Sequence, residues 1–247
     1  MTTAYAVVVP TIGRPSLDRL LSALDAESGP QPAAVVVVDD RPAPKQPLTL
    51  PDTDLPVKVL RSGGRGPAAA RNVGWRSIVA DWVCFLDDDV VPGRDWYDEL
   101  ASDLRQVDDS VVGSQGTITV PAPLRQGSPR RPTDDERRTL GLATAQWITA
   151  DMAYRRSALV SCGGFDERFP RAYREDADIA LRLTRAGGRI VQGARHTEHP
   201  VPVGRPSVLN SVRAQRGNRD DALMRRKHGR GWRPAIGEGR GRLPIHV

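Results

Sequence analysis

The sequence predicts an α/β domain built on a mostly parallel central sheet flanked by helices. Short, almost entirely apolar runs recur through the first half of the chain, helical segments alternate with them, and polar residues follow several of the runs directly. Apolar runs without alternation are typical of parallel strands that are covered on both faces. The length of 247 residues and the hydrophobic content of 39% allow one large domain, or one domain with an extension.

The first half reads as alternating strands and helices. A strand at residues 6–9 ends at Pro10, and four leucines between positions 17 and 24 then recur at the spacing of one helix face. Ser16 is the predicted N-cap of that helix. The other elements expected here are strands at 33–38, 57–60 and 82–86, a helix after the glycine-rich turn 63–67, and a helix at 96–105.

The second half is less regular. Residues 121–141 are rich in Pro, Arg and Asp and show no periodicity, so they are expected to be a long loop and a candidate lid. Around this loop the sequence predicts strands at 111–120 and 147–154, a helix at 175–186 and a basic final helix at 207–228.

Charge divides the chain at residue 203. Residues 204–247 contain eleven Lys or Arg against three acidic residues, a net charge of +8, which leaves −2 for residues 1–203. We therefore predict a domain at 1–203, with halves at 1–110 and 111–203, and a basic helical tail at 204–247. The tail could meet nucleic acid, an anionic membrane surface or a phosphorylated substrate, or it could be a solvated helix.

Nothing in the sequence resembles a membrane span or a signal peptide. No apolar run approaches the roughly 20 residues that cross a bilayer, and the N-terminus lacks a basic region before an apolar stretch. Cys84 and Cys162 are expected to be reduced thiols. The expected location is the cytoplasm, with contact at the inner membrane face through the tail as an option.

Polar clusters follow three of the predicted strands. Thr11 follows the first, Asp39 and Asp40 the second, and the triplet Asp87–Asp89 the fourth. In a parallel sheet ligands bind beyond the carboxyl ends of the strands, so one crevice should receive all three clusters. Adjacent carboxylates repel one another, and a divalent cation carrying a polyphosphate would relieve that repulsion.

Five ordered blocks of residues stand out along the chain. They are Val7-Val8-Val9-Pro10-Thr11 with Arg14-Pro15, Val37-Val38-Asp39-Asp40, Ala70-Arg71-Asn72 with Gly74, Phe85-Leu86-Asp87-Asp88-Asp89, and Gly163–Phe169 with Arg174-Glu175-Asp176-Ala177-Asp178. Together they resemble the family 2 glycosyltransferases, which are inverting enzymes of the GT-A fold, and they cover roughly residues 5–200 in the family's order.

The resemblance implies transfer of a sugar from a nucleotide-diphosphate sugar, most commonly a UDP-sugar, to an unknown acceptor hydroxyl. It implies Asp176 as the catalytic base, with Glu175 beside it. A divalent cation, Mn²⁺ or Mg²⁺, would be bound by Asp87 and Asp89, with His199, ahead of His196, as a further ligand. The donor and its nucleotide would be bound by Pro10, Thr11, Arg14, Asp39, Arg71, Asp87, Asp88 and Asp151.

Two other classes of function are weighed against this one. Sugar-phosphate nucleotidyltransferases also use magnesium on an α/β sheet, but residues 11–15 are a poor version of the glycine-rich basic loop that they need. A non-enzymatic nucleic-acid-binding protein could use the basic tail. The net charge of −2 on the rest of the chain and the lack of a nucleic-acid-binding module argue against that alternative.

Overall fold

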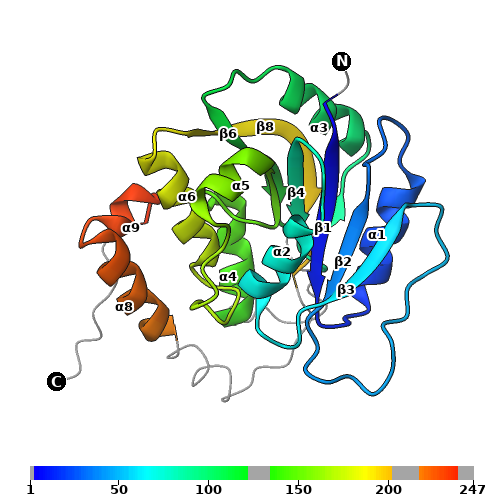
Figure 1. The fold of residues 1–247 in the computed structure, drawn as a ribbon, viewed down its shortest axis with the longest axis horizontal. Coiled ribbons are helices and arrows are strands. Elements are labelled where there is room, and N and C mark those ends of the chain that lie inside the picture. The colour runs from blue at the N-terminus through cyan, green and yellow to red at the C-terminus, as the bar shows by residue number, and fades with distance from the viewer. Residues whose placement is uncertain (1–2, 122–133, 202–216, 239–247) are drawn as a thin grey trace, which may run out of the picture.

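The computed structural model describes residues 3–121, 134–201 and 217–238, and Figure 1 shows the arrangement of their helices and strands. The strands are β1 (Tyr5–Thr11), β2 (Val35–Asp39), β3 (Val57–Arg61), β4 (Trp82–Leu86), β5 (Val91–Pro92), β6 (Val111–Thr119), β7 (Asp151–Arg155) and β8 (Arg189–Glu198). The helices are α1 (Ser16–Ala26), α2 (Pro67–Arg76), α3 (Trp96–Arg105), α4 (Asp134–Gly141), α5 (Arg156–Cys162), α6 (Glu175–Arg185), α8 (Gly217–His228) and α9 (Trp232–Ala235), with a 3₁₀ turn η1 at Leu142–Thr144.

The described strands form one sheet in the order β3-β2-β1-β4-β7-β6-β8-β5. Strands β3, β2, β1 and β4 are parallel, which confirms the prediction for the first half of the chain. Beyond β4 the sheet is mixed, because β7 runs antiparallel to both of its neighbours. The carboxyl ends of β1, β2 and β4 therefore lie at one edge, as the polar clusters predict.

Alternate residues of the strands bury against different helices. In β1, Tyr5, Val7 and Val9 belong to an apolar cluster that includes the inner faces of α1 and α3. Ala6 and Val8 point the other way, into a cluster with α2, α5 and α6. The sheet is thus sandwiched between two layers of helices (Figure 1), and its central strands are apolar on both faces for that reason.

The described part of the predicted basic tail is not a free solvated helix. Helices α8 and α9 pack against α6 on the side away from the sheet (Figure 1). The predicted start of this helix at 207 lies outside the described residues, and the described helix begins at Gly217. The apolar contact is made by Phe169, Ala177, Leu181, Met224, Trp232 and Ile236.

Several local predictions need correction. Ser16 is the first residue of α1, not its N-cap, and Pro15 precedes it without a side-chain cap. Residues 134–141 of the predicted loop form α4, which begins with acidic residues that favour a helix N-terminus. Residues 122–133, the rest of the candidate lid, lie outside the described residues. The strand expected at 147–154 begins only at Asp151.

Asp151, which was predicted to contact the donor, is fully buried and does not line the cavity described below. Its carboxylate accepts hydrogen bonds from Trp96 Nε1 at 2.8 Å, Arg195 Nε at 2.7 Å and Thr197 Oγ1 at 2.6 Å. Those partners belong to α3 and β8. The apolar pattern around Asp151 in the sequence did not show that these two elements lie next to β7. Asp151 joins β7 to both of them.

Replacing this buried carboxylate should destabilise the fold. Asp151→Ala would leave the Arg195 guanidinium, itself fully buried, without its main partner, so we expect a loss of about 3–5 kcal/mol in the free energy of unfolding. Urea denaturation measures it. Asp109→Ala is the control, because the Asp109 side chain is fully exposed and its loss should change stability by less than about 0.5 kcal/mol. A similar small change for Asp151→Ala would contradict this role.

Candidate active site

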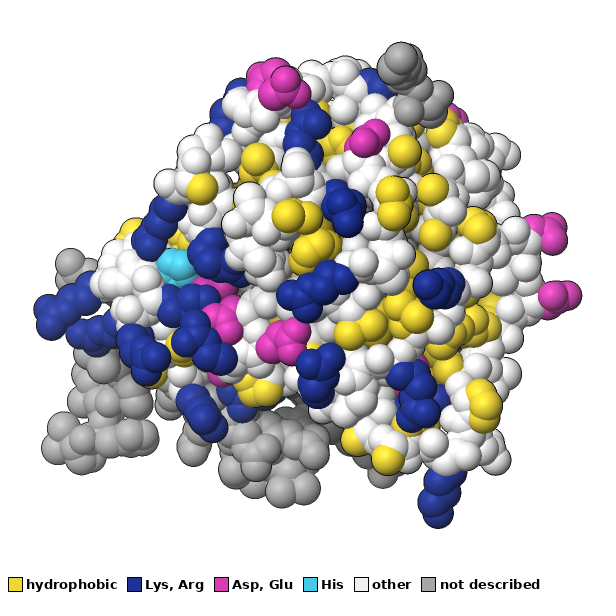
Figure 2. Space-filling view, viewed as in Figure 1, with side chains coloured by type: hydrophobic (Ala, Val, Ile, Leu, Met, Phe, Trp, Pro, Cys, Tyr) yellow, Lys and Arg dark blue, Asp and Glu magenta, His cyan; other side chains and the backbone are white. Residues whose placement is uncertain are grey.

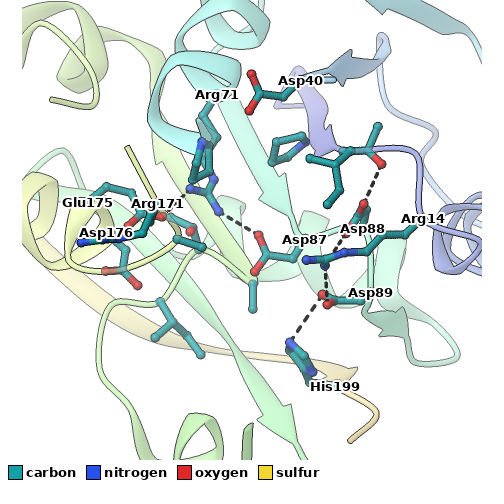
Figure 3. Close-up of a pocket in the computed structure, with 18 of the residues that line it drawn as sticks. Arg14, Asp40, Arg71, Asp87, Asp88, Asp89, Arg171, Glu175, Asp176 and His199 are labelled. Carbon is teal, nitrogen blue, oxygen red and sulfur yellow. Dashed lines mark hydrogen bonds and ion pairs between the residues drawn. The ribbon is translucent and has the colours of Figure 1, made fainter. Parts of the chain in front are cut away.

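A cavity of about 460 Å³ lies at the carboxyl ends of β1 and β4 (Figure 3). The residues that line it come from the end of β1, the loops after β1, β2 and β4, the start of α2, the turn η1, the residues before β7, the residue after β8, and the segment that leads into the first turn of α6. Its lining residues are Pro10, Thr11, Ile12, Arg14, Asp40, Pro67, Arg71, Asp87, Asp88, Asp89, Leu142, Ile148, Thr149, Ala150, Arg171, Ala172, Glu175, Asp176 and His199. The structure therefore brings together ten of the twelve residues predicted for the site.

Asp88 anchors the aspartate triplet to the end of β1. Thr11 Oγ1 donates a 2.6 Å hydrogen bond to Asp88, and Arg14 Nη1 donates to Asp88 at 3.0 Å and to Asp89 at 2.7 Å. Burial raises the pKa of Asp88, and these two partners oppose the rise by favouring the carboxylate. Both carboxylate oxygens of Asp88 are thus hydrogen-bonded within the protein, whereas Asp87 and Asp89 each accept from an arginine through one oxygen only.

Asp87, Asp89 and His199 form a candidate cation site. One ligand atom from each of them lies within 4.8 Å of the others, and His199 Nε2 is 3.5 Å from Asp89 Oδ1 (Figure 3). His199 follows β8, whose end pairs antiparallel with β5 directly after the triplet, and this pairing carries the imidazole to the carboxylates. His196 is exposed and lies near Glu99.

The donor set of this site fits Mn²⁺ or Mg²⁺. Carboxylate oxygens suit both ions, and an imidazole nitrogen is also a common ligand of transition metals. Burial, together with the charge of Asp87, raises the pKa of Asp89, which is the signature of carboxylates held close without full compensation. A divalent cation would supply the missing positive charge.

Arg71 connects the cation site to the other end of the cavity. Its buried guanidinium donates to Asp87 at 2.8 Å and to Glu175 at 2.9 Å, and it lies 5.6 Å from the centre of the Phe165 ring. Arg71 projects from α2, whose start needs the positive φ of Gly66 (95°) and the proline that follows. The sequence predicted Arg71 at the nucleotide, and the structure makes it a bridge between acidic groups.

Glu175 and Asp176 begin α6 and line the far end of the cavity. Glu175 is buried, with one oxygen on Arg71 and no hydrogen-bond partner for Oε2 among the described residues. Asp176 is partly exposed, and its Oδ1 accepts from the Ala177 amide at 2.7 Å. Burial, and then the neighbouring charge of Asp176, raises the pKa of Glu175 to about 8, while Arg71 opposes the rise. Burial also raises the pKa of Asp176.

Asp39 does not line the cavity, but its neighbour Asp40 does. Arg41 covers the Asp39 carboxylate through Nε and Nη2, both at 2.8 Å, and these hydrogen bonds lower the pKa of Asp39. Asp40 accepts from Ser62 Oγ at 2.7 Å and from the Gly66 amide at 2.9 Å, so it holds the turn that starts α2. Adjacent aspartates alternate in direction, and the sequence alone did not show which of the two faces the ligand.

Arg171 is the cavity residue that the sequence analysis missed most clearly. It lies five residues before Asp176, in a segment with no secondary structure of its own. Only its proximity in sequence to the acidic pair could have marked it, and many surface arginines share such a position.

The raised pKa of Glu175 predicts a pH dependence of stability. The folded protein keeps this proton above the ordinary pKa of 4.5, so stability should fall as pH rises from about 4.5 to about 8. Glu175→Gln should flatten this part of the profile by a few kcal/mol, as measured by urea unfolding at several pH values. Equal slopes in the two proteins would show that Glu175 ionises normally. Glu167→Gln, at a more exposed carboxylate, is the control.

Comparison with known proteins agrees with this geometry. The family model for glycosyl transferase family 2 matches residues 6–162. A pre-mycofactocin glycosyltransferase of Mycobacterium tuberculosis is 31% identical over 194 residues, which are 74% of this chain and 40% of the relative. The chain therefore spans about 40% of the length of the curated relative it matches.

Solved structures share the fold at low identity. The mannosyltransferase PcManGT from Pyrobaculum calidifontis, in complex with GDP-Man and Mn²⁺, matches with a TM-score of 0.57 at 20% identity, over 86% of this chain and 60% of that one. S. aureus TarS 1-349, in complex with UDP-GlcNAc, matches with a TM-score of 0.56 at 19% identity, over 82% of this chain and 60% of that one. From the matched family model and these neighbours, the chain belongs to glycosyl transferase family 2 and has the GT-A fold.

Proposed function

We propose that this chain transfers a sugar, with inversion, from a nucleotide-diphosphate sugar to an acceptor hydroxyl in a reaction that depends on a divalent cation. The observation that carries the proposal is the arrangement of one cavity. A candidate cation site of Asp87, Asp89 and His199 lies at one end and the acidic pair Glu175 and Asp176 at the other, so a leaving group and a base would act on opposite sides of one sugar.

The donor's pyrophosphate would lie against the aspartate triplet. Mn²⁺ or Mg²⁺ held by Asp87, Asp89 and His199 would neutralise the charge that develops on the departing nucleotide diphosphate. Arg14, half exposed at the cavity, is placed to meet a phosphate oxygen. Pro10 and Thr11 line the same end of the cavity. Asp39 stays a predicted nucleotide contact, and its hydrogen bonds with Arg41 would have to break for it to bind the nucleotide. We propose a UDP-sugar as the donor; related folds are seen with UDP-GlcNAc and with GDP-Man.

Asp176 would act as the base. It is the more exposed of the two acids, so an acceptor hydroxyl can reach it, and its raised pKa favours taking up the proton as the hydroxyl oxygen attacks the anomeric carbon. Glu175 lies beside it and contributes its position rather than its charge, because Arg71 holds one of its oxygens. The proton moves from the acceptor oxygen to Asp176, the new glycosidic bond forms on the face opposite the nucleotide, and the bond to the diphosphate oxygen breaks.

The family assignment argues against the nucleotidyltransferase and nucleic-acid-binding alternatives. No helix among the described residues has the length and apolarity of a membrane span. A cytoplasmic location and contact with anionic lipid stay predictions. Lys and Arg side chains gather over α8 and α9 in Figure 2, and the exposed Arg225, Arg226 and Arg230 of this region would make that contact.

Binding of nucleotide and cation tests the proposed cation site. UDP or GDP with Mn²⁺ should raise the thermal unfolding midpoint of the wild-type protein, because a ligand that binds only the folded state stabilises it, by about 2.7 kcal/mol at a hundred times its Kd. Asp89→Ala should remove the part of the shift that requires Mn²⁺. Asp52→Ala removes an exposed carboxylate elsewhere and should keep it. A full Mn²⁺-dependent shift in Asp89→Ala would exclude Asp89 as a ligand.

Transfer tests the base. Asp176→Asn keeps the shape of the side chain but cannot accept the proton, so release of nucleotide diphosphate from the donor should fall by roughly 10²–10⁴-fold. Donor affinity, measured by calorimetry with Mn²⁺, should stay within a few-fold of wild type. Lost donor affinity would instead place Asp176 in donor binding.

A further inference from the structure

The acidic residues of the C-terminal segment all face the same target. Residues 204–247 contain only three, Asp220, Asp221 and Glu238, among eleven basic residues. Each of the three forms an ion pair with an arginine of the segment 171–174, which leads directly into Glu175 and Asp176. Asp221 and Glu238 also pair with Arg233 of their own segment. A segment so rich in positive charge therefore presents its few negative charges to the approach to the acidic pair.

The first pair reaches the cavity itself. Arg171 Nη2 donates to Asp220 Oδ2 at 2.5 Å, and Asp220 is almost completely buried. Arg171 also lines the cavity, beside Glu175 and Asp176 (Figure 3). Helix α8 thus holds a side chain that forms part of the cavity wall.

The second group encloses Arg174. Its Nε donates to Asp221 at 2.8 Å, and its Nη2 donates to Glu238 at 3.0 Å and to Tyr173 Oη at 2.7 Å. Its guanidinium carbon also lies 4.7 Å from the centre of the Trp232 ring. Only 8% of the Arg174 side chain is exposed. Asp221, Trp232 and Glu238, which contact it, belong to α8, α9 and the residues just after α9.

The backbone of Arg174 explains why this enclosure matters. Arg174 is the residue before α6, and its φ of +78° is the left-handed conformation that residues other than glycine rarely adopt. Its carbonyl accepts the Asp178 amide at 2.8 Å, which closes the first turn of the helix that carries Glu175 and Asp176. Relaxation of Arg174 to negative φ would redirect that turn.

We propose that the segment α8–α9 is a positioning element for the acidic pair. It holds Arg174 in the left-handed conformation through Asp221, Glu238 and Trp232, and it holds Arg171 at the cavity through Asp220. The catalytic consequence rests on the proposed function, whereas the structural consequence for residues 171–178 does not.

Packing alone does not account for this arrangement. Phe169 and Leu181 already provide an apolar surface that Met224 and Trp232 cover. Buried carboxylates add net stability only with well-placed partners, and replacing such pairs by apolar side chains is often neutral or stabilising. The ion pairs are therefore better explained as fixing one backbone geometry. They keep Arg174 in a left-handed conformation that it would otherwise leave.

Hydrogen exchange of the full-length protein tests the structural part. Asp221→Asn combined with Glu238→Gln should speed exchange of the amides of residues 178–180, the first that donate within α6, by about tenfold, in the range expected when a strained left-handed residue is released. Arg226→Gln, on the exposed side of α8, is the matched control and should leave these amides unchanged. Faster exchange restricted to 217–238 would overturn the proposal. Glu238→Gln alone, at a side chain 40% exposed, is the milder variant with the same expectation.

Substitution of Arg174 itself tests the catalytic part. Glycine adopts positive φ without steric penalty, whereas alanine does not, although both lose every contact of the guanidinium. Arg174→Gly should therefore release nucleotide diphosphate about tenfold faster than Arg174→Ala, with equal donor affinity, and adding Asp221→Asn to Arg174→Gly should change little. Equal rates for the two variants would show that Arg174 only packs. If no nucleotide sugar is turned over, the proposed function fails while the hydrogen exchange still decides the positioning role.

Discussion

The buried guanidinium of Arg71 is the interaction on which the cavity depends. It contacts Asp87 at the cation end and Glu175 at the acidic end, so one side chain sets the separation of two groups that lie far apart in sequence. Without it, Asp87, Glu175 and Asp176 would share a cavity with their charges uncompensated, and the two ends would have no common reference. Arg71 can do this because α2 begins at a glycine-rich turn that Asp40 holds against the sheet.

The same principle extends around the cavity. Arg14 holds Asp88 and Asp89 at one end, and Arg174, itself held by the C-terminal segment, precedes Glu175 and Asp176 at the other. Arg71 thus pairs with Asp87 and Glu175, and Arg14 pairs with Asp88 and Asp89. Burial nevertheless raises the pKa of Asp88, Asp89, Glu175 and Asp176. A site of this kind is ready for a cation and a proton, because both would bring the positive charge that it lacks.

Local pattern was sufficient where one element's own residues carry the signal. The parallel strands β1, β2, β3 and β4, the leucine face of α1 and the aspartate triplet were all predicted, since apolar runs and adjacent charges are properties of a few consecutive residues. Strand β8 was not predicted, because its burial comes from its neighbours β6 and β5 and its sequence is mostly polar. Asp151 was misplaced for the related reason that its partners, Trp96 and Arg195, lie 55 and 44 positions away.

The sequence by itself determined the fold class, the edge of the sheet where the cavity lies and most of the predicted residues that line it, because strand periodicity and ordered motifs are written in consecutive positions. Tertiary structure alone decided which carboxylates face the cavity and which are consumed by partners. It separated Asp40 from Asp39 and committed Asp151 to the core. It also turned the basic tail into a support for Arg171 and Arg174. These outcomes depend on pairings between distant segments, and charge pairing across distant segments leaves no periodic trace in a single sequence.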